Sequence, residues 1–282
     1  MNNHNALYII ATPIGNLLDM TQRAVDVLKQ VDCIAAEDTR HSARLMQHYH
    51  IATPLIAYHD HSDATQVARI VEKLRAGQSV ALISDAGTPL ISDPGYRLVT
   101  KVRSEGMTVV PIPGPCAVIA ALSASGLPCD RFSFEGFPPA KQKARQSQFE
   151  ALLKDTRTLI FYESPHRITA SLADMRDIFG GDRQIVFARE LTKTFETFLS
   201  GTLDEICVKV AEDDNQRRGE IVVMVRGAQE EEKREALDEA TEKTMRILMQ
   251  ELSVKQAAAL ASKLTGEKKN RLYQWALEQQ GK

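Results

Sequence analysis

The sequence predicts an α/β protein of two domains, each with a sheet covered by helices, followed by a small helical appendix. The chain has 282 residues, which is long enough for two compact domains. Over most of its length, short β-rich runs alternate with segments of helical periodicity. Repeated alternation of strand and helix is typical of a largely parallel sheet with helices on both faces.

The first domain is expected over residues 1–126. Its strand candidates, in order, are ALYIIATP, CIAAED, PLIAYH, SVALIS and MTVVPIP, and its helix candidates are residues 21–30, 40–49, 65–76, 96–105 and 116–124. Ligands of parallel sheets bind beyond the carboxyl ends of the strands. The turns TPIGN, AEDTR, YHDHS, SDAGTP and PGP are therefore expected to face one crevice.

The second domain is expected over residues 127–229, after LPCDRF, whose Pro and Asp suit a hinge. Its strand candidates are RFSFEGF, RTLIFYES, RQIVFARE, TFETFLSG and GEIVVMVRG, its helix candidates are residues 141–154, 168–179 and 203–212, and its last runs are expected to form an antiparallel hairpin. Residues 230–282 are predicted to be a charged linker and helices at 244–251, 254–264 and 269–279. Such a helical region is either a nucleic-acid-binding unit or a dimer arm.

Charge and cysteine usage restrict the classes of function. The chain has 35 Lys and Arg against 37 Asp and Glu, so a polyanionic partner must be met by local basic patches. The four cysteines are scattered without a short pairing motif, which disfavours both a zinc site and a disulfide framework. The start MNNHNALYII does not resemble a signal peptide, and no apolar run reaches the roughly 20 residues that span a bilayer. We therefore expect a soluble, cytoplasmic protein.

The segment SDAGTPLISDPG, residues 84–95, is the most informative turn. Gly87 and Gly95 permit positive φ and close approach of a ligand, and Asp85 and Asp93 can accept hydrogen bonds from an amine or a ribose. Its spacing is neither GxGxxG nor a P-loop. Two interpretations remain: a site for a nucleoside-like ligand, or a tight strand-to-helix turn capped by Asp93. The neighbouring PGP turn would point its free N–H groups at the same crevice.

Six motifs occur in a recognisable order: TPIGNLLDMTQRA, AEDTRHS, SDAGTPLISDPG, PGPCAVIAAL, FYESPHR and RELTKTFE. Together they resemble the tetrapyrrole methylase superfamily and, within it, the ribosomal RNA small subunit methyltransferase I family. SDAGTP matches the glycine-rich loop of the superfamily in general, whereas AEDTRHS, FYESPHR and RELTKTFE point to the ribosomal RNA branch. The resemblance extends from about Leu7 to the C-terminal helices.

The resemblance implies two α/β domains of the tetrapyrrole methylase type, with S-adenosyl-L-methionine folded in the cleft between them, in a homodimer. It implies methylation of the ribose 2′-hydroxyl of a cytidine in the decoding region of 16S ribosomal RNA, within the small ribosomal subunit. Carried onto this sequence, the cofactor contacts are Pro13, Ser84, Asp85, Ala86, Gly87, Ile91, Cys116, Ala117, Tyr162, Gly219 and Glu220.

Methylation of a ribose hydroxyl needs a base or nearby positive charge and in-line placement, because the hydroxyl is a poor nucleophile. No metal is required, since the sulfonium already activates the methyl group. The candidates are Glu37, Asp38 and Arg40 in AEDTR, and Glu190 with Lys193 in RELTK. For Glu37 and Asp38 the alternative is helix N-capping. Lys193 either stabilises a developing oxyanion or binds a phosphate.

Local basic clusters supply the candidate RNA contacts, although any single one is more often a solvated face. These candidates are Lys141, Lys143, Arg145, His166, Arg167, Lys268, Lys269 and Arg271. His59 and His61 have no third partner at a usual spacing, which disfavours a metal site. The competing functions are C-methylation of a tetrapyrrole, which has no need of basic C-terminal helices, and non-catalytic RNA binding by an assembly factor.

Overall fold

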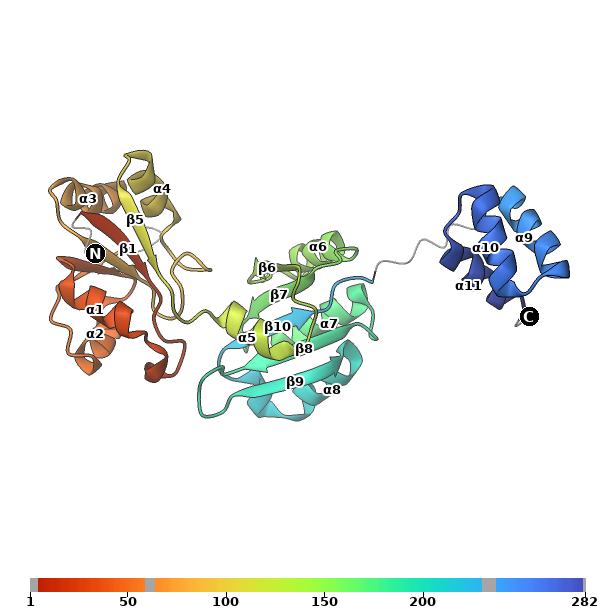
Figure 1. Ribbon diagram of the computed structural model, residues 1–282. Coiled ribbons are helices and arrows are strands. Elements are labelled where there is room, and N and C mark those ends of the chain that lie inside the picture. The colour runs from red at the N-terminus through yellow and green to blue at the C-terminus, as the bar shows by residue number, and fades with distance from the viewer. Residues whose placement is uncertain (1–4, 59–63, 230–236, 281–282) are drawn as a thin grey trace. The chain divides into compact units, whose positions relative to one another are not determined.

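The computed structural model describes residues 5–58, 64–229 and 237–280, and it divides into two compact units, residues 1–228 and residues 229–282 (Figure 1). The first unit holds two five-stranded sheets with their helices. The second unit holds three helices. An α/β protein with a helical appendix, as the sequence predicts, is therefore confirmed.

The first sheet is entirely parallel and has the strand order β3, β2, β4, β1, β5. Its strands are β1 (Ala6–Ile10), β2 (Cys33–Ala36), β3 (Leu55–Ala57), β4 (Val80–Ile83) and β5 (Thr108–Ile112). The helices between them are α1 (Gln22–Gln30), α2 (Thr39–His48), α3 (Ala64–Arg75) and α4 (Tyr96–Ser104), and a short 3-10 turn, η1 (Leu17–Asp19), precedes α1.

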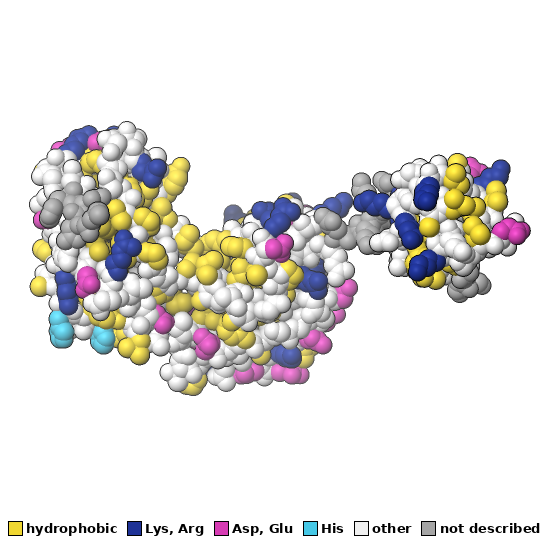
Figure 2. Space-filling view, in the orientation of Figure 1, with side chains coloured by type: hydrophobic (Ala, Val, Ile, Leu, Met, Phe, Trp, Pro, Cys, Tyr) yellow, Lys and Arg dark blue, Asp and Glu magenta, His cyan; other side chains and the backbone are white. Residues whose placement is uncertain are grey.

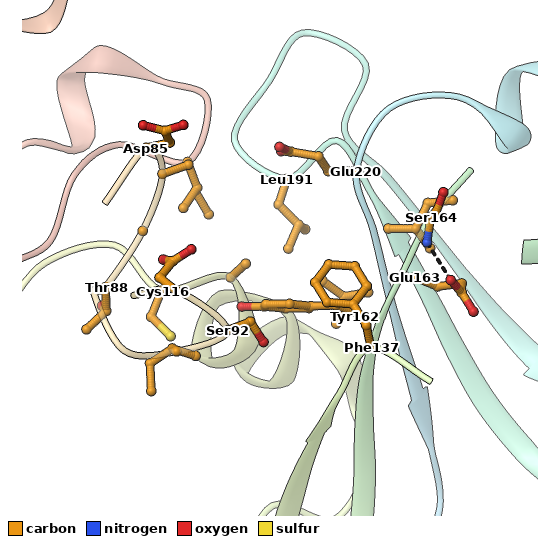
Figure 3. A pocket seen from close by; sticks show the side chains of 18 of the residues that line it. Asp85, Thr88, Ser92, Cys116, Phe137, Tyr162, Glu163, Ser164, Leu191 and Glu220 are labelled. Carbon is orange, nitrogen blue, oxygen red and sulfur yellow. Dashed lines mark hydrogen bonds between the residues drawn. The ribbon is translucent and has the colours of Figure 1, made fainter. Parts of the chain in front are cut away.

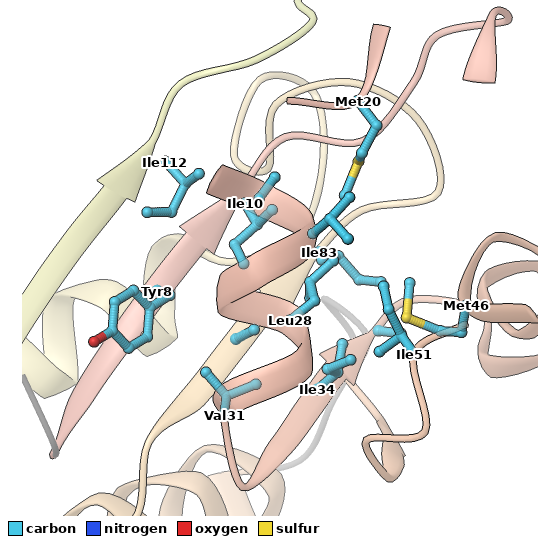
Figure 4. Close-up of a cluster of buried hydrophobic side chains, with 14 of the residues drawn as sticks. Tyr8, Ile10, Met20, Leu28, Val31, Ile34, Met46, Ile51, Ile83 and Ile112 are labelled. Atoms are coloured by element: carbon cyan, nitrogen blue, oxygen red, sulfur yellow. The ribbon is translucent and has the colours of Figure 1, made fainter. Parts of the chain in front are cut away.

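Successive side chains of a strand point to opposite faces of this sheet, so each face of the sheet has its own hydrophobic core. Tyr8 and Ile10 of β1 pack with α1 and α2 on one face (Figure 4), whereas Leu7 packs with α3 and α4 on the other. Each fully buried Leu or Ile contributes roughly 1.5–3 kcal/mol. The helices that follow β1 and β4 thus lie on opposite faces. Because β1 and β4 are neighbours, a crevice opens at their carboxyl ends.

The second sheet is mixed, with the strand order β6, β7, β10, β8, β9. Its elements are β6 (Phe132–Gly136), α6 (Gln142–Leu152), β7 (Thr158–Glu163), α7 (Ile168–Phe179), β8 (Gln184–Arg189), β9 (Thr197–Thr202), α8 (Leu203–Glu212), the 3-10 turn η2 (Asp214–Arg217) and β10 (Ile221–Val225). The hairpin is formed by β8 and β9. β10 instead enters between β7 and β8, antiparallel to both, so the prediction that the last runs pair as a hairpin is wrong. Burial of all five β10 residues favours this central position over an edge.

Helix α5 (Ala117–Ser125) connects the two sheets. It follows β5 of the first sheet, yet its Val118, Ala121 and Leu122 pack on the second sheet against residues of β7, β8 and β10. These residues and Ser125 form its buried face, whereas Ile119 on another side is 52% exposed. The expected domain boundary at residue 126 stays a prediction. Helix α5 lies before that boundary in the chain, although it packs on the second sheet.

The C-terminal unit consists of α9 (Glu239–Glu251), α10 (Val254–Thr265) and α11 (Lys269–Gln280) around a small apolar core. α9 begins five residues before the predicted start at 244, because Asp238 caps it by accepting a hydrogen bond from the Thr241 N–H at 2.8 Å. Trp275 contributes to this core and carries the Arg246 guanidinium 5.9 Å from its ring centroid. None of the helices described by the structure is long and apolar enough to cross a bilayer.

Candidate functional site

Three turns at the carboxyl ends of β1, β4 and β5 are joined by hydrogen bonds. Thr12 and Gly87 exchange two backbone bonds of 2.9 and 3.0 Å, and the Thr12 hydroxyl donates to the Ser84 carbonyl. The Thr88 hydroxyl donates to the Pro115 carbonyl at 2.9 Å. The turns TPIGN, SDAGTP and PGP are therefore one rigid framework, as expected from a shared crevice.

Gly87 is the residue on which this framework depends. Its φ is +86°, a conformation that residues with a side chain rarely adopt, and a Cβ there would lie 3.3 Å from Cγ2 of Ile14. The alternative interpretation, a turn capped by Asp93, is wrong. Gly95 is the N-cap of α4, and no side chain caps that helix.

A cavity of about 500 Å³ lies between the SDAGTP framework and the second sheet, and we name it the first cavity. This volume is in the range of small-molecule sites. Figure 3 shows Asp85 and Thr88 on one side, Glu220 and Glu163 on the other, and Tyr162 and Leu191 between them. The remaining lining comes from α5, the FYESP segment and residues 219–222.

The first cavity is acidic. None of its described lining residues is Lys, Arg or His, and five are acidic: Glu37, Asp85, Asp93, Glu163 and Glu220. The carboxylate of Glu163 is fully buried and paired with Arg167. Burial raises the pKa of Asp93 to about 6, with further contributions from nearby Glu37 and Asp85 and an opposing hydrogen bond with Ser84. A site of this charge favours a cationic ligand.

An aromatic wall closes the first cavity against the second sheet. The Tyr162 ring meets Phe134 and Phe137 edge to face, with centroids 4.8 and 5.5 Å away. Burial raises the pKa of Tyr162, whose phenol oxygen also accepts the Val118 N–H at the start of α5. The phenol is therefore neutral at physiological pH, and Phe137, which is 53% exposed, presents a flat apolar surface to a ligand.

Glu163, beside Tyr162, holds the ESP turn in place. Its buried carboxylate accepts hydrogen bonds from the Ser164 N–H at 2.6 Å and from the Ser171 hydroxyl, and it pairs with Arg167 at 2.8 Å. These bonds satisfy a charge that would otherwise be costly to bury. Arg167 thus has a structural partner, although 27% of its side chain remains exposed.

Lys193 lies in the connection between β8 and β9, where its ammonium group contacts two glutamates, Glu190 and Glu220. Its Nζ is 2.8 Å from Oε1 of Glu190 and 2.8 Å from Oε2 of Glu220. Burial alone would lower the pKa of Lys193, but the hydrogen bonds to both glutamates outweigh it and raise that pKa. Lys193 is therefore a fixed cation at physiological pH and cannot serve as a base.

The backbone around Lys193 is strained. Glu190 and Thr192 have φ values of +51° and +67°, which are uncommon for residues with side chains and exceptional for a β-branched one. Strain of this kind is held in place by surrounding contacts and is often found at functional sites. One such contact joins the two sheets: the Asn16 N–H donates to the Thr192 hydroxyl at 3.2 Å.

A second cavity, of about 330 Å³, adjoins the first and shares Ile14, Asp85, Ala86 and Glu220 with it. Its remaining lining residues are Pro13, Gly15, Leu17, His41, Ser42, Arg44, Leu45, Ser84 and Lys193. It therefore contains three basic side chains, from α2 and from the RELTK segment.

The predicted cofactor residues fall mainly around the first cavity. Those that line it are Asp85, Ala86, Gly87, Ile91, Cys116, Ala117, Tyr162, Gly219 and Glu220. Pro13 and Ser84 line the second cavity instead, with Ser84 buried.

Three of the predicted catalytic residues, Glu37, Asp38 and Arg40, line a further cavity of about 410 Å³ together with Asp85. Glu37 also lines the first cavity, whereas Lys193 lines the second. Asp38 is the N-cap of α2, with Oδ1 2.8 Å from the Arg40 N–H, and the side-chain hydrogen bond from Arg40 is the main cause that lowers its pKa. The capping alternative is thus confirmed for Asp38, and Arg40 points into solvent with its side chain 91% exposed.

The predicted RNA contacts also differ in accessibility. Arg145 is buried and pairs with Asp174 at 2.5 Å, so this residue supports α6 and α7 and does not face a ligand. Most of the others lie on the surface, namely Lys141, Lys143, His166, Lys268 and Lys269, while Arg271 is half-buried and pairs with Glu267. His59 and His61 lie outside the described residues. Among the residues described, no three His, Cys, Asp or Glu side chains are grouped so as to hold a metal ion.

Sequence reasoning missed Phe137, Glu163 and Leu191 as lining residues of the first cavity. Glu163 stands inside FYESPHR, so the motif itself was a sufficient signal. Phe137 and Leu191 are ordinary apolar residues in sequence. Only the packing of the second sheet against the SDAGTP framework places them at a cavity.

Comparison with protein families gives two matches. A model described as Tetrapyrrole (Corrin/Porphyrin) Methylases matches residues 6–207, and one described as the RsmI C-terminal HTH domain matches residues 235–280. Together the two matched ranges include both sheets' elements up to α8 and all three C-terminal helices.

Curated relatives with the name Ribosomal RNA small subunit methyltransferase I are similar over nearly the whole chain. One from Vibrio cholerae is 56% identical over 280 residues, 99% of this chain and 97% of the relative. Another, from Pseudomonas aeruginosa, is 56% identical over 98% of each chain, and one from Escherichia coli O157:H7 is 52% identical over 99% and 97%.

Solved structures share the fold at low identity. Uroporphyrin-III-C-methyltransferase from Thermus thermophilus superposes with a TM-score of 0.56 at 17% identity, covering 79% of this chain and 94% of that one. A diphthine synthase superposes with a TM-score of 0.58 at 13% identity, covering 78% and 90%. At these identities the likeness concerns the fold of the two sheets.

Proposed function

Since the chain belongs to the tetrapyrrole methylase family, we propose that it transfers the methyl group of S-adenosyl-L-methionine to a ribose 2′-hydroxyl of small-subunit ribosomal RNA. The acceptor is a cytidine in the decoding region of 16S ribosomal RNA. The names of the relatives support an RNA acceptor. The observation that carries the proposal is the first cavity, whose described lining has five acidic residues and no basic side chain.

The residues of the first cavity fit the donor. When bound, S-adenosyl-L-methionine supplies a methyl group already activated by a sulfonium cation. The carboxylates of the cavity attract that cation, and Phe137 and Tyr162 offer faces on which an adenine can stack. Gly87 lets the backbone approach the ligand closely, because it has no side chain. Its positive φ and the nearness of Ile14 both disfavour a residue with a Cβ at this position.

At the acceptor, this chain must orient the hydroxyl and receive its proton. Asp85 and Glu220 are the two carboxylates that line both cavities. Glu220 is engaged by Lys193, so we assign proton acceptance to Asp85, which is held by the Asp38 N–H at 3.1 Å. Lys193, fixed as a cation, then stabilises the negative charge that develops on the ribose oxygen.

We further propose a homodimer that acts in the cytoplasm, with no metal ion, and an organisation into domains at 1–126, 127–229 and 230–282. The exposed lysines at the start of α6 and at the start of α11 bind the RNA backbone: Lys141, Lys143, Lys268 and Lys269. His166 and Arg167, which follow the ESP turn in the chain, join these contacts.

Transfer of labelled methyl groups tests this function. Small ribosomal subunits from cells that lack the protein are incubated with labelled donor, and the modified ribose is mapped. We expect label on one cytidine ribose in the decoding region. Labelling of a porphyrinogen instead would favour tetrapyrrole C-methylation, and tight RNA binding with no label at saturating donor would favour an assembly factor.

A matched pair of glycine variants ties the reaction to the first cavity. Gly87 and Gly77 have φ values of +86° and +85°, but nothing lies within 4 Å of a Cβ at Gly77. Both Ala substitutions carry the same backbone cost. We expect Gly87→Ala to weaken donor binding in calorimetry by roughly tenfold, about 1.4 kcal/mol, with Gly77→Ala close to wild type. Equal affinities would contradict the location of the donor.

A further inference from the structure

The two adjoining cavities carry opposite charge. Acidic residues alone provide the charged lining of the first cavity among the residues described, whereas the second adds His41, Arg44 and Lys193 to the shared Asp85 and Glu220. A phosphodiester is repelled by the first lining and attracted by the basic side of the second. The border between these environments is formed by Ile14, Asp85, Ala86 and Glu220.

Helix α2 presents its basic residues on one exposed face. His41, Arg44 and His48 are spaced i, i+3 and i+7, which places them along one side of the helix, and all three are exposed. The opposite side is anchored by buried Ser42 and Met46. In Figure 2, histidine side chains gather on one edge of the first sheet's part of the molecule, with Lys or Arg side chains beside them. The helix is thus fixed to the fold while its basic face stays available to a ligand.

Lys193 completes the basic side from the second sheet. Its ammonium has three N–H donors, and the described structure uses two of them for Glu190 and Glu220, which leaves one for a ligand oxygen. Gly15 makes room for its side chain, because a Cβ there would lie only 2.4 Å from Cγ of Lys193. The cation is therefore held at the border of the two cavities in one orientation.

We propose that the second cavity binds the RNA backbone at the acceptor nucleotide, with its phosphate groups on Arg44 and His41, its ribose at the border formed by Asp85 and Ala86, and its 2′-oxygen toward Lys193. The inference rests on the proposed function and names the part of the site that takes the acceptor. The ligand class is a single-stranded ribonucleotide segment. Such a segment can place one ribose at the border while its phosphates stay out of the first cavity, because like charges repel them there.

The donor's own carboxylate is the other anion that the basic side attracts. The two occupants predict different results for the same substitution. If the carboxylate lies there, removal of Arg44 weakens donor binding. If RNA lies there, removal of Arg44 weakens binding of the ribosomal particle and leaves donor binding unchanged.

Arg44→Ala tests the assignment, with Arg103→Ala as its matched control. Both arginines are exposed on helices, but Arg103, on α4, lines neither cavity. Neither substitution removes buried contacts, so both variants are expected to fold. Three quantities are measured: donor affinity by calorimetry, affinity for small subunits in the presence of S-adenosylhomocysteine across a salt series, and KM for small subunits in methyl transfer.

We expect Arg44→Ala to weaken particle binding and raise KM by about tenfold, and to reduce the dependence of log affinity on log salt by about one. Donor affinity stays within about twofold of wild type, and Arg103→Ala changes none of these quantities by more than that. His41→Ala is expected to weaken particle binding in the same direction and to a smaller extent, because an imidazole offers fewer hydrogen-bond donors to a phosphate than a guanidinium does.

Two results would overturn the inference. In one, Arg44→Ala matches Arg103→Ala in particle affinity and salt dependence; in the other, it loses donor affinity while particle binding is retained. Failure of the proposed function is distinguished by wild-type protein that labels no RNA. The particle-binding series needs no turnover, so it still reports on the second cavity in that event.

Discussion

Asp93 provides a sensitive probe of the acidic cavity, because its protonation is coupled to the charge of the ligand. Burial raises its pKa from 3.8 to about 6, helped by the neighbouring Glu37 and Asp85, although a hydrogen bond with Ser84 opposes the shift. A bound sulfonium cation favours the ionised carboxylate and lowers this pKa again. Donor binding therefore releases a proton and strengthens as pH rises through 6.

The size of the effect follows from the two pKa values. At pH 5 a carboxyl group with a pKa of about 6 is roughly nine-tenths protonated, so donor affinity is expected to be about tenfold weaker than at pH 7, or ~1.4 kcal/mol. This is the limit in which the bound cation restores the ordinary pKa of 3.8. Asp93→Asn removes the titrating group, so its donor affinity should be nearly flat over the same range and, in this limit, about 100-fold weaker than that of wild type at pH 7.

Calorimetric titration at pH 5, 6 and 7 measures this difference directly. The range stays below the ordinary pKa of an α-amino group, which is about 8, so the donor's own amine does not titrate. Asp130→Asn, at an exposed position that does not line the first cavity, is the control and should follow wild type. Parallel pH profiles for wild type and Asp93→Asn would refute the coupling.

The pH dependence of the unfolding free energy of the donor-free protein is an independent test of the raised pKa of Asp93. A carboxyl group with a raised pKa in the folded state binds its proton more tightly there than in the unfolded chain, so wild type loses stability as pH rises from about 4 through 6. Asp93→Asn does not. After allowance for partial hydration we expect the variant to gain about 1–2 kcal/mol relative to wild type between pH 4 and 7. Urea unfolding at both pH values measures it, and a gain in the opposite direction would show that burial does not control this group.

Two further substitutions test the supporting structure. Gly219→Ala and Gly106→Ala share a φ near +75°, but a Cβ at Gly219 would lie 2.2 Å from Oε1 of Glu190, whereas at Gly106 it meets nothing within 4 Å. Both should lose about 1 kcal/mol of unfolding free energy for the backbone conformation, and only Gly219→Ala should also lose methyl transfer; equal activities would argue against a role for the Glu190 cluster. Arg145→Ala, which leaves the buried carboxylate of Asp174 without its ion pair, should cost about 3–5 kcal/mol in urea unfolding. A loss below about 1 kcal/mol would show that water replaces the guanidinium.

The elements and their order could be predicted from the amino-acid sequence, because periodicity and turn chemistry depend on neighbouring residues. The helices α7 and α8 occur at the residues predicted, and Asp38 caps α2 as the capping alternative expected. The motifs likewise identified the loop that borders the first cavity. Each of these features depends on contacts among residues close together in the chain.

Contacts between residues far apart in the chain could not be predicted in this way and are known from the fold. Three examples are the pairing of β10 between β7 and β8, the packing of α5 on the second sheet, and the ion pair of Lys193 with Glu220. In each case, neither segment has a local pattern that indicates its partner. Arg145 resembles an RNA contact in sequence and is a buried ion-pair partner in the fold. The difference in charge between the two cavities also depends on contacts between distant residues. It arises where turns from both sheets meet, and burial of apolar surface contributed by many segments brings those turns together.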